Sequence, residues 1–183
     1  MREILFKAKR IDNGEWLEGV PVDVTPLTCF SSDSVKKEIV MVRAGFADWG
    51  MPRGIEGASV DPETVCQYTG KKILQNQVTG KSPQTISVWY DDLIAIYTIY
   101  YDDFGKPVRN KIAVVRVEFD EKYQIPYARF VFGTMEEVIS ECDIPYMDGY
   151  EDWPFTFWLE YMENGQKQFW EWEVIGNAHD QEE

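Results

Sequence analysis

Histidine and cysteine are scarce in this chain of 183 residues, and several familiar chemical motifs are missing. The chain has one histidine, His179, and three widely spaced cysteines, Cys29, Cys66 and Cys142. An odd number of separated cysteines argues against a disulfide framework or a zinc knuckle, so we expect three idle thiols in a reducing compartment. Neither a P-loop nor a G-x-G-x-x-G loop occurs, and no serine lies in a G-x-S-x-G elbow. These absences predict a protein with no catalytic residues, no metal site and no cofactor.

Long apolar runs are also absent. No stretch of 18 apolar residues occurs, so we expect no membrane-spanning segment. The first ten residues, MREILFKAKR, carry charges throughout and lack the apolar core of a secretion signal. We therefore expect the protein to stay in the cytoplasm in which it is made.

Basic residues become rare toward the end of the chain. The formal net charge is −14, and residues 123–183 carry fourteen acids against two bases, Arg129 and Lys167. The same stretch holds 14 of the 27 aromatic residues. Its negative charge would repel nucleic-acid phosphates, so we expect no direct nucleic-acid binding. The charge suits a basic protein partner, or it serves only to keep the protein in solution.

Alternating apolar and polar residues predict strands along most of the chain. Asp12-Asn13-Gly14 predicts a hairpin turn within ILFKAKRIDNGEWLEGV, and Asn164-Gly165 predicts another within FTFWLEYMENGQKQFWEWEVIG. The segment LIAIYTIYY is apolar on both faces, which favours a central strand. Thr134 and Glu137 form a capping box that predicts a helix in TMEEVISECD. We predict a mainly β protein, a barrel-like sheet or a sandwich, with one or two short helices.

Three stretches lack a strand or helix pattern and are predicted to be loops: residues 21–34, 44–59 and 74–85. The chain is long enough for one domain of 1–183. The third loop is the point at which it would divide into an N-terminal portion, 1–73, and a larger C-terminal sheet, 86–178.

The segment VDPETVCQYTG, residues 60–70, has the composition of a site, but its pattern is that of a structural motif. Asp61 and Pro62 predict a turn, and the residues after them alternate as a short strand that ends at Gly70. Thr64, Cys66 and Tyr68 fall on one face of that strand. No base lies near Cys66 in the sequence to lower the pKa of its thiol, so a reactive thiolate is not predicted.

Three segments, in order, resemble the YopX family of phage and prophage proteins. They are MREILFKAKRIDNGEWLEG, VDPETVCQYTGKKI and EVIGNAHD, and they cover 41 residues. The resemblance implies a small, mostly β protein that is encoded by a phage or prophage and works in the cytoplasm of a bacterial host. It implies no catalytic residues.

The leading functional hypothesis is a phage accessory protein without catalytic activity, a β scaffold that binds an unknown protein partner or assembles with itself. The aromatic and acidic residues of its interaction surface would be Asp148, Glu151, Asp152, Trp153, Trp158, Glu171 and Glu173. One alternative is an acidic mimic of nucleic acid that inhibits a host DNA-binding protein. Another is a small hydrolase that uses carboxylates around Asp91, Asp92 or Asp148, which would require a cleft that holds two of them.

Overall fold

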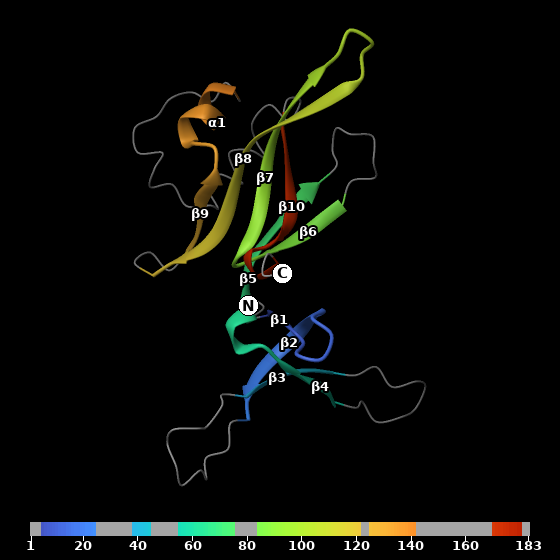
Figure 1. The fold of residues 1–183 in the computed structure, drawn as a ribbon, viewed down its shortest axis with the longest axis vertical. Helices are drawn as coiled ribbons and strands as arrows, with labels where there is room; N and C mark the ends of the chain where they lie inside the picture. Colours follow the sequence, from blue (N-terminus) through green and yellow to red (C-terminus); the bar gives the residue numbers. More distant parts are fainter. Residues whose placement is uncertain are drawn as a thin grey trace. The chain divides into compact units, whose positions relative to one another are not determined.

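The protein is described by a computed structural model that covers residues 5–24, 38–44, 55–75, 84–121, 125–141 and 170–180 (Figure 1). Within these ranges the chain forms ten strands, one α-helix and two 3-10 helices. The mainly β prediction is therefore confirmed. The chain divides into two compact units, which we call unit 1, Met1–Tyr68, and unit 2, Thr69–Glu183. The division falls within one strand, β5, and not in the predicted loop of residues 74–85.

Unit 1 is an antiparallel sheet with the strand order β4-β3-β2-β1-β5. Its strands are β1 (Phe6–Lys9), β2 (Trp16–Asp23), β3 (Ile39–Ala44), β4 (Ile55–Val60) and the start of β5 (Cys66–Gln75). The predicted first hairpin is confirmed as β1 and β2, and Gly14 takes the positive φ of +70° that its turn requires.

The sheet of unit 1 curls toward closure, because Arg10 at the end of β1 bridges Val60 at the end of β4. The backbone nitrogen of Asp61 also donates to the carbonyl of Lys9 over 2.9 Å. The enclosed side contains Ala8, Met41 and Val60, each with no exposed surface. A small barrel-like core is therefore complete within these strands.

The VDPETVCQYTG segment forms the turn that joins this barrel to β5. Its predicted turn is the 3-10 helix η1 (Pro62–Thr64), and the Asp61 carboxylate accepts from the backbone nitrogen of Glu63 over 3.1 Å. The hydroxyl of Thr64 accepts from the backbone nitrogen of Lys9 over 2.9 Å. The prediction that the strand ends at Gly70 was wrong. β5 continues to Gln75, because glycine can take the φ of +82° at this point without interrupting the strand.

Two stretches of unit 1 that were predicted to be loops form strand in part. β4 lies in the stretch 44–59 that was expected to be a loop, and β2 extends to Asp23 in the stretch 21–34. The sequence of β4, IEGASV, contains glycine, alanine and serine, which are weak strand formers. Tertiary pairing with β3 along the whole strand stabilises it instead.

Unit 2 has a four-stranded antiparallel sheet in the order β10-β7-β8-β9, and β6 (Gln84–Trp89) pairs with β5. The sheet strands are β7 (Asp92–Tyr101), β8 (Pro107–Asp120), β9 (Ile125–Phe132) and β10 (Trp170–Asn177). The short 3-10 helix η3 (Ala178–Asp180) follows β10. β7 has a neighbour on both sides, so the prediction of a central strand at LIAIYTIYY is confirmed. The other arm of the predicted second hairpin lies outside the described residues.

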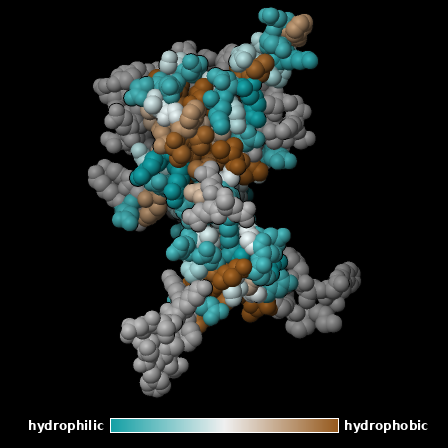
Figure 2. All heavy atoms as spheres, viewed as in Figure 1, coloured by the Kyte–Doolittle hydropathy of each residue, from teal (hydrophilic) through white to brown (hydrophobic). Residues whose placement is uncertain are grey.

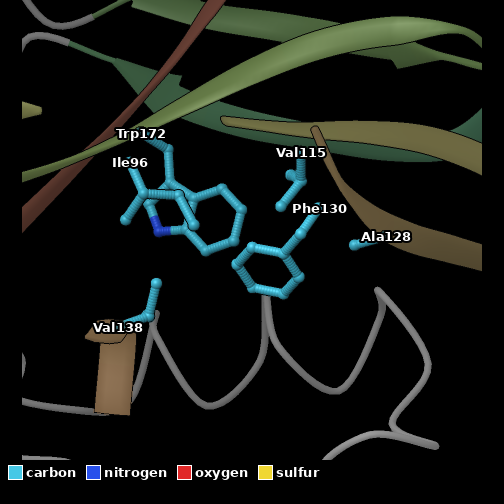
Figure 3. Close-up of a pocket in the computed structure, with 6 residues that line it drawn as sticks. All are labelled: Ile96, Val115, Ala128, Phe130, Val138 and Trp172. Atoms are coloured by element: carbon cyan, nitrogen blue, oxygen red, sulfur yellow. The ribbon is translucent and has the colours of Figure 1, made fainter. Parts of the chain in front are cut away.

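The predicted helix is confirmed as α1 (Met135–Glu141). The capping box is present, because the backbone nitrogen of Thr134 donates to the Glu137 carboxylate and that of Glu137 donates to the Thr134 hydroxyl. Val138 is fully buried in the core between α1 and the sheet. Figure 3 shows Val138, Trp172 and Phe130 around a small cavity there.

That cavity is too small for a ligand. Its lining is Ile96, Val115, Ala128, Phe130, Val138 and Trp172, and its volume of about 10 Å³ matches a single water-sized sphere. Ligand pockets are usually tens of times larger. We interpret it as a packing gap in the core of unit 2.

In the part of the chain that the structure describes, no helix is long and apolar enough to cross a membrane.

Candidate functional site at the β7–β8 hairpin

The structure describes two of the seven residues predicted to form an interaction surface. Asp148, Glu151, Asp152, Trp153 and Trp158 lie outside the described residues. Glu171 and Glu173 lie on β10, and their side chains share the face opposite Trp172 and Val174, as the alternation predicted. Glu171 is only 4% exposed, so it cannot contribute to an open surface, and that part of the prediction was wrong.

The adjacent acids Asp91 and Asp92 stabilise the corner between β6 and β7. Asp92 is buried, and its carboxylate accepts from the backbone nitrogen of Trp89 over 2.8 Å and from the Asn177 side-chain amide over 3.0 Å. Among the described non-glycine residues, Asp91 alone has a positive φ, +66°. Its carboxylate pairs with Arg116, and its carbonyl accepts from the backbone nitrogen of Ala178 over 2.8 Å. Both acids therefore hold the GNAHD segment against this corner.

His179 joins the same corner without forming an obvious catalytic pair. Its Nε2 lies 3.6 Å from an oxygen of Asp91, which is too long for a good hydrogen bond. Its backbone nitrogen donates to the side-chain oxygen of Asn177 over 3.1 Å. Asp91 and Asp92, two of the acids named in the hydrolase hypothesis, thus have structural contacts that explain why they are acids.

The hairpin that joins β7 to β8 has a well-defined turn. The Asp102 carboxylate accepts from the backbone nitrogens of Phe104 and Lys106, over 2.9 and 2.8 Å. The backbone nitrogen of Gly105 donates to the carbonyl of Asp102 over 2.9 Å, and Gly105 has a φ of +72°. Asp is favoured at such positions because its short side chain can bond the backbone ahead of it. These bonds fix the conformation of the turn.

Three aromatic side chains are exposed on this turn and beside it. Phe104 is 87% exposed, Tyr101 57% and Tyr100 54%. Because neighbouring strand residues point to opposite faces, the two tyrosines flank the hairpin and Phe104 caps its end. Figure 1 shows the hairpin formed by β7 and β8, which extends past the other strands of its sheet. We call Tyr100, Tyr101 and Phe104 the aromatic tip.

An ion-pair cluster supports the hairpin below the tip. Arg109 of β8 reaches across β7 to β10, where its Nη2 donates to Glu173 over 2.9 Å and its Nε lies 3.1 Å from Glu171. The Arg109 guanidinium lies over the ring of Tyr97, 3.9 Å from the ring centroid. Arg109 thus links β8 to β10 across the intervening strand β7. This link limits movement at the base of the hairpin.

The environment of this ion-pair cluster shifts the pKa of one tyrosine. The pKa of the Tyr97 phenol is raised, first because burial disfavours the phenolate and then because the nearby Glu173 charge repels it. Arg109 lowers the same pKa, but its effect is smaller. Tyr97 therefore remains a neutral phenol well beyond physiological pH. It serves as a stacking surface for Arg109 and not as an acid or base.

The aromatic tip was visible in the sequence only as a turn. The segment DDFGKP, residues 102–107, has the composition of a turn, and it reverses the chain between β7 and β8. The sequence signal that marks the tip is a pair of tyrosines directly before the turn and a phenylalanine within it. Burial decides whether such rings fill a core or meet solvent, and pattern alone does not reveal burial.

Comparison with known proteins gives no relative. No family model matches the chain, no curated protein matches it, and no solved structure matches it. The resemblance of the three segments to the YopX family stays a prediction.

Proposed function

We propose that this protein is a binding protein without catalytic activity that inserts the aromatic tip of the β7–β8 hairpin into a groove of a protein partner. The observation that carries the proposal is the exposure of three rings on a turn whose conformation Asp102 already fixes. Aromatic side chains contribute much of the energy at protein interfaces, and they lose little conformational entropy when they bind.

The shape of the tip indicates the shape of its partner. Rings on both faces and at the end of a two-stranded hairpin can all be buried together only in a groove, because a flat surface would contact one face. The partner groove should therefore be apolar, with hydrogen-bond acceptors for the two tyrosine hydroxyls.

The net charge of unit 2 indicates which charge the rim of the partner groove should carry. Unit 2 carries 21 acids against 10 bases, a net charge of −11. A neutral or basic rim would be attracted to this unit, whereas an acidic rim would be repelled. If the YopX resemblance holds, the partner is a protein of the bacterial host or of the phage itself.

The experiment compares the proteins that the full chain and its variants bind and retain from a bacterial lysate. Tyr101→Ser with Phe104→Ser removes two rings of the tip from an exposed turn. We expect any protein held through the tip to be retained at least about tenfold less by this variant, as for interface residues of high energy. Asp102→Ala keeps the rings but loosens the turn, so it should weaken retention to a smaller extent.

The matched control is Val131→Ser, which removes an equally exposed apolar side chain on β9, at 60% exposure. Proteins lost with the tip variant and kept with the control support the proposal. If the tip variant retains the same proteins at the same level as the unchanged chain, the proposal is wrong.

A further inference from the structure

The outer face of unit 1 carries a second apolar surface that the aromatic tip does not explain. Exposed side chains recur every second residue along β2 and just beyond it, at Val20 (57%), Val22 (42%) and Val24 (43%). On the neighbouring strand, Val42 stands directly opposite Val20, and Val40 stands directly opposite Val22. We call these five residues the valine face.

The valine face is not needed for the core of unit 1. The barrel-like interior is already filled from the other side of the same strands by Ala8, Ile39, Met41 and Val60. An antiparallel sheet with one buried face normally presents polar residues on the other. Figure 2 shows hydrophobic side chains at the surface of unit 1 as well as of unit 2. A contiguous exposed apolar patch of this kind marks an interaction site.

We propose that the valine face binds the valine face of a second copy of this chain, related by a two-fold axis. The face is built of β-branched side chains on a ladder of directly opposed pairs, and a two-fold contact buries the same patch on both copies. Two such sheets pack face to face about 10 Å apart, with strand directions nearly aligned. A two-fold contact of this kind closes on itself and cannot extend into a filament.

Charge favours a second copy over a strongly charged partner at this surface. Unit 1 carries eleven acids against eight bases, a net charge of −3, while unit 2 has −11. The charges that border the five valines are of both signs: the exposed Glu38 stands opposite Val24 at one end, and Glu18 and Lys7 stand opposite each other beside Val20 at the other. At one end of the face, Lys7 and Lys9 lie over the ring of Trp16, at 4.8 and 5.7 Å from its centroid. Two copies of unit 1 can therefore approach with little repulsion between them.

The size of the valine face predicts a weak dimer. Five partly exposed valines offer on the order of a few hundred Å² per copy, below the roughly 800 Å² that each partner contributes to a standard interface. We expect dimerisation to depend on concentration, with half-association in the range of about 10 µM to 1 mM. Each whole chain carries −14, so raising the salt concentration should strengthen the dimer by screening this repulsion.

Sedimentation equilibrium of the full chain between 10 µM and 1 mM tests the proposal. The triple variant Val20→Thr, Val22→Thr and Val24→Thr keeps the β-branched shape that suits a strand but adds hydroxyls to the face. We expect it to raise the dimer dissociation constant at least tenfold. Val131→Thr, an equally conservative change of an exposed valine in unit 2, should leave the constant unchanged.

Folding and binding are separated by recording thermal unfolding of each variant. A triple variant that melts like the unchanged chain but no longer dimerises supports the proposal. Three outcomes overturn it: a monomer at 1 mM, a dimer that the triple variant forms equally well, or a dimer that salt weakens. The aromatic tip is intact in every variant, so these outcomes are independent of the function proposed above.

Discussion

The two units differ in the side chains that they carry on the sheet face away from the core. In unit 1 the interior is apolar and complete, and apolar valines continue onto the outer face. In unit 2 the face opposite the core carries charges that are paired with one another, including Glu171, which is 4% exposed. Val131 of unit 2 is also exposed, but the row of exposed valines at every second residue lies in unit 1, the unit with little net charge.

The charged face of unit 2 also bears on the nucleic-acid mimic hypothesis. A mimic needs a continuous stripe of carboxylates, yet the described acids on this face alternate with arginines. Arg109 pairs with Glu171 and Glu173, and Arg116 and Arg129 both contact Glu118. The described part of unit 2 therefore offers no uninterrupted acidic stripe, and the hypothesis stays a prediction for residues outside it.

The largest expected effect comes from breaking the paired charges of unit 2. Arg109→Ala leaves the Glu171 carboxylate buried without its partner, so we expect a loss of about 3 kcal/mol in the free energy of unfolding. Urea unfolding monitored by tryptophan fluorescence would measure it. Combining Arg109→Ala with Glu171→Leu should recover most of the loss, because the buried charge is then gone.

Arg129→Ala is the matched control for this prediction. Arg129 also pairs with a carboxylate, at 3.0 Å from Glu118, but its side chain is 67% exposed. Water already solvates such a pair, so its removal should lower stability by less than about 1 kcal/mol. Equal losses of stability for Arg109→Ala and Arg129→Ala would show that burial of Glu171 adds nothing to the cost of breaking its ion pair. The comparison between the apolar outer face of unit 1 and the charged face of unit 2 would then fail.

An intermediate effect is expected inside the barrel of unit 1. A Cβ at Gly19 would stand 2.5 Å from the carbonyl oxygen of Val42 and 3.0 Å from Cγ of Met41. The backbone oxygen cannot move without disturbing the β2–β3 pairing, so Gly19→Ala should cost about 1–3 kcal/mol. Chemical denaturation, with hydrogen exchange of β2 and β3 amides, would locate the loss in unit 1.

Gly57→Ala sharpens the contrast between the two sides of this sheet. Its Cβ would meet Cγ1 of Val40 at 3.1 Å, and this contact is with a side chain at the valine face. The Val40 side chain can shift by a few tenths of an ångström, so the change should be within about 0.5 kcal/mol of neutral. A loss as large as that of Gly19→Ala would mean that the outer face is packed as tightly as the interior.

The sequence predicted local features better than it predicted exposure. The N-terminal hairpin, the capped turn at Asp61, the central strand β7 and the Thr134–Glu137 capping box each depend on residues near one another in the chain, and each is confirmed. β4 was missed because its weak strand sequence is stabilised by pairing with β3 and by closure through Arg10.

The candidate binding surfaces were missed for a related reason. Alternation places Val20 and Val22 on one face of a strand but does not say whether that face meets solvent. It likewise placed Glu171 opposite Trp172 correctly, and the expectation that an acid lies at the surface then failed. Exposure depends on which strands close over which face, and that follows from contacts between distant parts of the chain.

The smallest expected effect is a pH dependence that belongs to unit 2 alone. The pKa of Tyr97 is raised in the folded protein by burial and by Glu173, whereas in the unfolded chain it returns to about 10. Above pH 10 the unfolded chain therefore loses its proton before the folded one, and the free energy of unfolding falls as pH rises. The stabilisation is fully present below pH 10 and disappears as pH passes the folded pKa.

Tyr97→Phe keeps the ring beneath Arg109 but removes the proton, so its stability should fall less than that of the unchanged chain between pH 9 and 11.5. Urea unfolding across this range measures the difference, and Tyr101→Phe, an exposed tyrosine on the same hairpin, is the control that should follow the unchanged chain. Parallel curves for all three proteins would mean that Tyr97 titrates as if it were in water, and the cluster at the hairpin root would then be more open than its ion pairs indicate.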